Sequence, residues 1–157
     1  RQEMVADLAA EALFGESSPL YLKLYEQGLI DSSFGGGFET IDGCAMLLCS
    51  GDSDDPAAVQ AAILERAREI AAEGLDETSF LRMKRSALGR RIRQLDSFDT
   101  TCFRVCAYHL SDFDYFRFPE ICRGIEKEAI GAFIARVVTP ERACLSVIRP
   151  LNDSEEA

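Results

Sequence analysis

The sequence predicts a single α+β domain, with helices packed on one mixed or antiparallel sheet. Three observations lead to this prediction. Apolar residues recur at helical spacing over most of the chain, and a glycine-rich hairpin pattern interrupts them near residue 40. A last apolar run at 143–148 has the character of a strand. The chain of 157 residues has the length of one domain, which we expect at 1–150, followed by a polar tail at 151–157.

The first two expected elements are a pair of helices. Residues 2–14 place their apolar side chains on one face, and Gly15 is a natural stop. Ser18 is a suitable N-cap and Pro19 a suitable first helical residue, so a second helix is expected to begin there. This helix should end near Gly28.

A β-hairpin is predicted next. Asp42-Gly43 is a strong turn signal, and the segment before it is rich in Phe, Thr and Ile. The segment after it, 44–49, is apolar on both faces, so we expect a buried strand in the centre of a sheet. The helix pair, the hairpin, several helices and the final strand complete the predicted layout.

The three consecutive glycines Gly35, Gly36 and Gly37 then lie within the first strand of this hairpin. A phosphate-binding loop would lead into a helix N-terminus, whereas strand residues follow here. Two interpretations remain open. The glycines either accommodate a bulge or a closely packed helix, or they leave a bare strand that faces a cavity where a peptide can approach.

The remaining chain is predicted to be mostly helical. Asp55 caps a helix that starts at Pro56, and Asp76 caps the next one. The core-facing side of this second helix is expected to carry Leu81, Leu88, Ile92 and Leu95. Further helices are expected at 98–110, 115–123 and 126–137, and Cys102, Cys106 and His109 are expected to share a packed face of the first of these.

The charges and cysteines limit the possible functions. The net charge of −10 repels nucleic acids and anionic membranes, so neither is expected as a partner. There is no apolar run of roughly 18 residues and no signal peptide pattern, so no membrane span is expected. The six cysteines lie among apolar neighbours and form no C-x-x-C pair, which predicts reduced core thiols in a cytoplasmic protein.

The residues offer little catalytic chemistry. Cys102 and His109 would lie roughly 10 Å apart along a helix, whereas zinc holds each ligand within about 2.3 Å. The acidic run that starts at Asp52 lacks the glycine and glutamate of a calcium-binding loop. With one histidine and no nucleophile motif, we expect no catalytic residue, no metal ligand and no cofactor in this chain.

A basic arc is the remaining candidate site. Arg82, Arg85, Arg90 and Arg93 fall on one side of the expected helix that Asp76 caps. A solvated basic surface is the simpler interpretation. The alternative is an anion or phosphate site in a cytoplasmic binding module.

The order of several motifs resembles the pitrilysin or insulinase family of zinc metallopeptidases. These motifs are LFGESSPLYLKLYEQGLIDSSF, SGDSDDP, GLDETSFLRMKRSALGRRIRQLDS and ACLSVIRP, and the similarity runs from about residue 9 to 150. It is greatest to the C-terminal half of bacterial insulinase-like peptidases. The resemblance implies an α+β domain that forms half of a clamshell around a chamber. The family's His-x-x-Glu-His zinc motif does not occur in this sequence.

The resemblance implies a non-catalytic substrate-chamber domain. Zinc is then expected in an N-terminal catalytic domain or partner subunit, and the substrate is a peptide. Tyr25, Gly35, Gly36 and Gly37 are the candidate chamber residues; the family's substrate-contacting Arg and Tyr have no clear counterpart here, where Tyr25 or Lys23 replaces the Arg. The alternative is a non-enzymatic structural or core subunit of the same family, without any zinc site.

Related domains begin with two strands that precede the first helix, and we expect these two strands to be missing upstream of Arg1. We therefore expect the chain to be an excised fragment whose sheet has fewer strands than that of its relatives. An unpaired strand edge can pair with another chain. Self-association of the isolated chain is the corresponding expectation.

Overall fold

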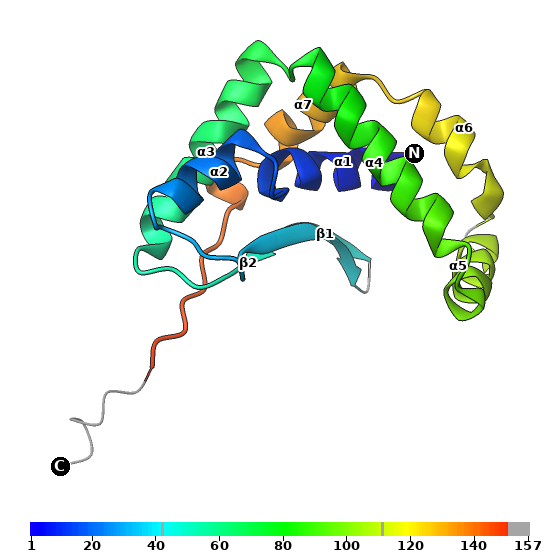
Figure 1. Cartoon of the computed structure of the whole chain (residues 1–157), viewed down its shortest axis with the longest axis horizontal. Helices are drawn as coiled ribbons and strands as arrows, with labels where there is room; N and C mark the ends of the chain where they lie inside the picture. The colour runs from blue at the N-terminus through cyan, green and yellow to red at the C-terminus, as the bar shows by residue number, and fades with distance from the viewer. Residues whose placement is uncertain (42, 111, 151–157) are drawn as a thin grey trace.

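In the computed structural model, which describes residues 1–150 except 42 and 111, helices form an arch over a β-hairpin (Figure 1). This arrangement confirms the predicted α+β class. The expected polar tail and the first turn residue, Asp42, lie outside the described residues. In chain order the elements are α1 (Gln2–Phe14), α2 (Pro19–Glu26), β1 (Gly35–Ile41), β2 (Cys44–Ser50), α3 (Pro56–Glu73), α4 (Glu77–Gln94), α5 (Phe98–Leu110), η1 (Tyr115–Arg117), α6 (Phe118–Arg123), α7 (Lys127–Val137) and η2 (Pro140–Arg142).

Three helices begin at the side-chain caps that the sequence predicts. Ser18, Asp55 and Asp76 each accept a hydrogen bond from the backbone N–H three residues later, at 3.1, 3.0 and 2.8 Å. Pro19 and Pro56 occupy the first helical position of α2 and α3, where a missing N–H costs nothing. Each cap is worth about 1 kcal/mol. Local sequence therefore sets these helix boundaries.

The hairpin and its register also follow the prediction. β1 and β2 pair antiparallel from Gly35 opposite Ser50 to Ile41 opposite Cys44. Gly43 has φ +83°, a conformation that favours glycine in a tight turn. The three glycines lie within β1, as expected.

The prediction that residues 44–49 form a buried central strand is wrong. Within the described residues the sheet has two strands, so both are edge strands. α1 packs against β1 on one face of the hairpin, and the other face remains open (Figure 1). Because each strand has only one covered face, Met46 and Leu48 of β2 are exposed despite their apolar character.

The core lies between α1, α3 and α7. α1 contacts β1, α2, α3, α4 and α7, so it is the central helix of the fold. Lys84 supports the neighbouring end of α6 by donating hydrogen bonds of 2.7 Å to the carbonyls of Arg123 and Ile125. The largest fully buried side chains are Leu8, Leu13, Leu24, Ile70, Cys122, Ile125, Ile130 and Ile134.

The prediction of which residues of α4 face the core is wrong in part. Phe80 and Met83 are the buried residues of this helix, whereas Leu81 and Ile92 are exposed. Leu88 and Leu95 are partly buried against the core, as expected. The apolar residues of this segment permit two overlapping helical stripes, and the packing of α1 and α6 against α4 selects the other one.

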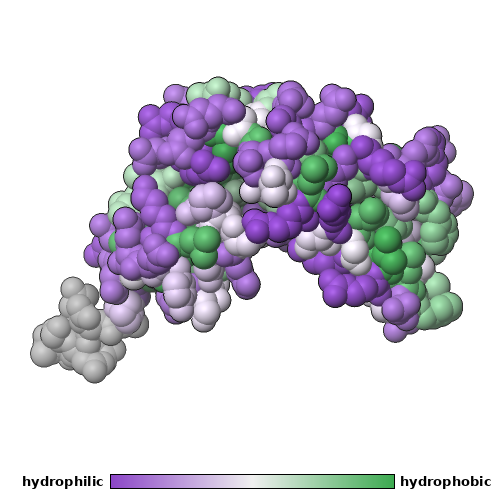
Figure 2. Space-filling view, turned by 45° about the horizontal axis from the view of Figure 1, so that its top comes forward, coloured by the Kyte–Doolittle hydropathy of each residue, from purple (hydrophilic) through white to green (hydrophobic). Residues whose placement is uncertain are grey.

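The prediction that Cys102, Cys106 and His109 share a packed face of α5 is also wrong. None of the thirteen described residues of α5 is buried, and Cys102, Cys106 and His109 are all exposed. α5 extends beyond the end of α4, and apolar residues gather at this end of the molecule (Figure 2). Leu110 is 88% exposed. Despite this apolar surface, no helix in the described part is both long and apolar enough to span a bilayer.

The cysteines are free, but most are not core residues. Cys122 is buried and Cys49 is partly buried, whereas the other four are exposed. The prediction of buried thiols is therefore wrong for Cys44, Cys102, Cys106 and Cys144. Three of these lie on β2 and α5, the two elements that are less covered than their apolar sequences predict.

The predicted final strand at 143–148 does not form in the structure. Residues 143–150 have no regular secondary structure, and Leu145, Val147 and Ile148 are exposed. A strand needs an adjacent strand edge for its backbone hydrogen bonds. The apolar pattern is present, but no described strand pairs with this segment.

Candidate functional site

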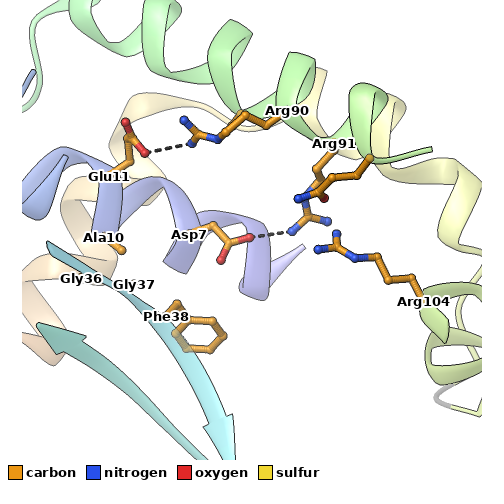
Figure 3. A pocket seen from close by; sticks show the side chains of 11 residues that line it. Asp7, Ala10, Glu11, Gly36, Gly37, Phe38, Arg90, Arg91 and Arg104 are labelled. Carbon is orange, nitrogen blue, oxygen red and sulfur yellow. Dashed lines mark hydrogen bonds and ion pairs between the residues drawn. The ribbon is translucent and has the colours of Figure 1, made fainter. Parts of the chain in front are cut away.

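The hairpin and the helices beside it form the candidate site. A pocket of about 260 Å³ lies against β1, and we call it the arginine pocket. Residues of four elements line it: Asp7 and Glu11 of α1, Gly36 to Phe38 of β1, Arg90 and Arg91 of α4, and Arg104 of α5 (Figure 3). A second pocket of about 390 Å³ lies between the hairpin and α7, and Phe38 lines both.

The three glycines of β1 have different surroundings. A Cβ at Gly36 would lie 2.6 Å from the carbonyl oxygen of Leu48 and 2.7 Å from Cδ2 of Phe14, so β2 and α1 together leave no room for a side chain there. At Gly35 and Gly37 a Cβ would meet no atom within 4 Å. The packed-helix interpretation therefore applies to Gly36, and the bare-strand interpretation to Gly35 and Gly37.

Side chains alternate between the two faces of the hairpin, so Gly35 and Gly37 share the face opposite α1. Met46 and Leu48 of β2 also lie on this face, because they pair with Glu39 and Gly37. It is an exposed apolar surface with a bare backbone strip. We call it the outer face, and its residues are Gly35, Gly37, Glu39, Ile41, Cys44, Met46, Leu48 and Ser50.

Tyr25, the fourth candidate from the sequence, lies on α2 and is exposed. Its ring stacks on Tyr21 with centroids 5.9 Å apart, as expected for residues one helical turn apart. Tyr21 in turn contacts Phe34, directly before β1. Tyr25 is not among the residues that line the two pockets, so the structure does not bring it together with Gly36 and Gly37.

Of the three ion pairs that join α1 to α4 among the described residues, two lie within the arginine pocket. Arg91 donates to Asp7 at 2.6 Å, and Arg90 donates to Glu11 at 2.9 Å (Figure 3). Burial raises the pKa of Asp7 above its ordinary value, and the Arg91 guanidinium offsets this effect only in part. The pocket is thus a partly desolvated site, where charge interactions are stronger than in water.

Tyr108 connects α5 to this charged group. Its hydroxyl donates a hydrogen bond to Glu3, and Arg91 lies 3.8 Å from the same carboxylate. Tyr108 also stacks on Tyr115, with centroids 5.4 Å apart. Burial, reinforced by the hydrogen bond to Glu3, raises the pKa of Tyr108 to about 12.

Replacing Tyr108 with phenylalanine tests this link. The ring contacts remain and one hydrogen bond is lost, so we expect Tyr108→Phe to lower the free energy of unfolding by about 1 kcal/mol at pH 7. Since the folded pKa lies above the ordinary tyrosine value, this stabilisation is full below about pH 10 and is lost as the pH rises towards 12. Urea unfolding from pH 8 to 11.5 measures it.

The difference between wild type and Tyr108→Phe should therefore shrink at high pH. Tyr25→Phe is the matched control, because the Tyr25 side chain is exposed. A difference between wild type and Tyr108→Phe that stays constant up to pH 11.5 would contradict the assigned role of the Tyr108 hydroxyl.

The described residues do not fit a metal ion. Among residues 1–41, 43–110 and 112–150, no three His, Cys, Asp or Glu side chains are grouped so that they could hold one.

Sequence reasoning missed most of the arginine pocket. Of the predicted basic arc, Arg90 lines the pocket, whereas Arg82, Arg85 and Arg93 are exposed elsewhere on α4. Arg91 and Arg104 were not singled out. The charged residues of α1 at i and i+4, Asp7 and Glu11, were the one available signal, because acidic side chains on an otherwise apolar helix need partners.

Comparison with known proteins identifies the family. The family model described as the peptidase M16 inactive domain matches residues 1–87, more than half of the chain. The chain belongs to the peptidase M16 family. This confirms the resemblance to the C-terminal, inactive domain of insulinase-family proteases.

Individual relatives agree with the M16 assignment. The uncharacterized zinc protease YmfH of Bacillus subtilis (strain 168) is 26% identical over 154 residues, which is 96% of this chain and 35% of YmfH. A crystal structure described as an M16-like peptidase from Alicyclobacillus acidocaldarius has a TM-score of 0.78 and 22% identity, over 85% of this chain and 32% of that one.

A second solved structure has the same fold. It is described as a zinc protease from Bordetella pertussis Tohama I, with a TM-score of 0.67 and 16% identity, over 90% of this chain and 82% of that one. The M16 chain spans about a third of the length of YmfH and of the Alicyclobacillus protein.

Proposed function

We propose that this chain is the non-catalytic substrate-chamber domain of a zinc metallopeptidase that degrades or processes peptides, and that it is inactive alone. The zinc ion and the catalytic base belong, in this proposal, to an N-terminal domain or partner subunit of the same peptidase. The match to the M16 inactive domain is the observation that carries the proposal. The six free cysteines support a cytoplasmic location, which stays a prediction.

The outer face supports this role physically. An extended peptide can approach the backbone closely at Gly35 and Gly37, where no side chain intervenes. Met46 and Leu48 offer apolar contact beside this strip. A surface that restricts a peptide raises its effective concentration at a catalytic centre located elsewhere, so it assists hydrolysis without supplying acid, base or metal.

Binding of an unstructured, fluorescein-labelled peptide tests the proposal. We expect Leu48→Glu to weaken binding about tenfold, because it removes an apolar contact of the outer face. Leu22→Glu is the matched control, since Leu22 on α2 is 50% exposed and Leu48 is 54% exposed. Fluorescence anisotropy of the labelled peptide measures the affinity of each variant.

The same preparation tests the absence of activity. With added zinc, the chain alone is expected to leave a quenched fluorogenic peptide uncleaved. Cleavage by the chain alone would overturn the non-catalytic assignment. If no unstructured peptide binds, or if both leucine variants weaken binding equally, the chamber role fails and the alternative of a structural subunit is favoured.

A further inference from the structure

We infer that the arginine pocket binds a peptide carboxylate, either an acidic side chain or the chain terminus, and that Arg104 is its principal partner. This inference rests on the proposed function, because it names the chemical group that the peptide-holding surface would recognise.

Arg104 is the cation of the pocket that has no ion-pair partner among the described residues, although its charge favours the ionised form of Asp7. Arg90 and Arg91 are each paired with a carboxylate of α1, at 2.9 and 2.6 Å. Glu3, the next carboxylate, accepts the hydrogen bond of Tyr108. Arg104 makes no hydrogen bond or ion pair with any described residue, although its side chain is partly buried and lines the pocket (Figure 3).

The charge of the lining favours a monoanion. Three guanidinium groups and two carboxylates line the pocket, which leaves one net positive charge in a protein of net charge −10. A carboxylate neutralises this charge, whereas a phosphate dianion would leave an excess of negative charge beside Asp7 and Glu11. The planar guanidinium also matches a carboxylate in geometry, with two parallel N–H donors.

The size and the walls of the pocket indicate a single residue. Its volume of about 260 Å³ is below the range of roughly 300–1,000 Å³ typical of whole-ligand sites. Ala10, Phe38 and Ala87 provide apolar walls that suit the aliphatic part of a side chain. Gly36 to Phe38 of β1 line the pocket, and one edge of β1 is unpaired among the described residues, so a peptide that follows this edge can place one carboxylate in the pocket.

Three labelled peptides of one sequence test this inference on the chain. The first has one glutamate and an amidated C-terminus, the second has glutamine in its place and an amidated C-terminus, and the third has glutamine and a free C-terminus. We expect the first or the third to bind about tenfold more tightly than the second, as one charge-assisted pair permits. The preferred peptide identifies the source of the carboxylate.

Arg104→Gln should abolish this preference and leave the affinity for the second peptide unchanged. Arg82→Gln is the control, because Arg82 is an exposed arginine of α4 outside the pocket. Circular dichroism should give both variants a Tm close to that of wild type, since neither arginine has a hydrogen bond or ion pair with a described residue to lose, and Arg104 acts on Asp7 only through its charge.

The outcomes separate this inference from the proposed function. Equal binding of the three peptides, or an unchanged preference in Arg104→Gln, overturns the carboxylate site and leaves peptide holding intact. Absence of binding for all three peptides overturns both.

Discussion

Gly36→Ala is expected to destabilise the chain by about 2–3 kcal/mol, because it overpacks the contact between β1 and α1. The new Cβ would lie 2.6 Å from a backbone oxygen of β2 and 2.7 Å from the Phe14 ring. The oxygen belongs to the backbone of the paired strand, so it cannot turn away as the end of a flexible side chain could. Thermal unfolding should show a decrease in Tm of roughly 5–10 °C.

Gly37→Ala is the matched control, at the neighbouring position of the same strand. Its Cβ would point into open space on the outer face, and alanine is slightly favoured over glycine in a strand, so Tm should stay equal or rise slightly. Equal losses for the two variants would mean that α1 does not pack on β1 as described.

Ile134→Ala is expected to lower the free energy of unfolding by about 2–5 kcal/mol. Ile134 of α7 is completely buried, and α7 packs against both α1 and α3. Removing three carbons there leaves a cavity at the junction of these helices. Urea denaturation followed by circular dichroism measures the loss.

Ile148→Ala is the control, because the same substitution falls on a residue that is 96% exposed. Its effect should stay within about 0.5 kcal/mol. A loss above 1 kcal/mol would show that the 143–150 segment is packed in solution, as the sequence-based strand prediction expected, and would contradict the exposed conformation.

The elements of this fold were predictable where their signals are local. Ser18, Asp55 and Asp76 cap helices within three residues of themselves, and Gly43 sets the hairpin turn at its own position. The order of motifs also carried the family resemblance, which the match to the M16 inactive domain confirms. None of these signals requires knowledge of a distant part of the chain.

Burial was mispredicted wherever a distant partner decides it. The apolar sequences of β2, α5 and 143–148 predict covered elements, yet the described structure leaves them largely exposed. An apolar pattern states that a surface can be buried, whereas the packing of other elements decides whether it is. On α4 two apolar stripes overlap, and the packing of the neighbouring helices buries Phe80 and Met83, whereas the sequence had favoured the other stripe.

The sequence by itself determined the helix caps, the hairpin with its three internal glycines, the α+β class and the family. Only the tertiary structure separated Gly36, which packs under α1, from Gly35 and Gly37, which face open space. It alone brought Arg104 of α5 beside Arg90 and Arg91 of α4. The physical reason is range: caps and turns form within a few residues, whereas a pocket is formed by side chains that only the packing of separate elements brings together.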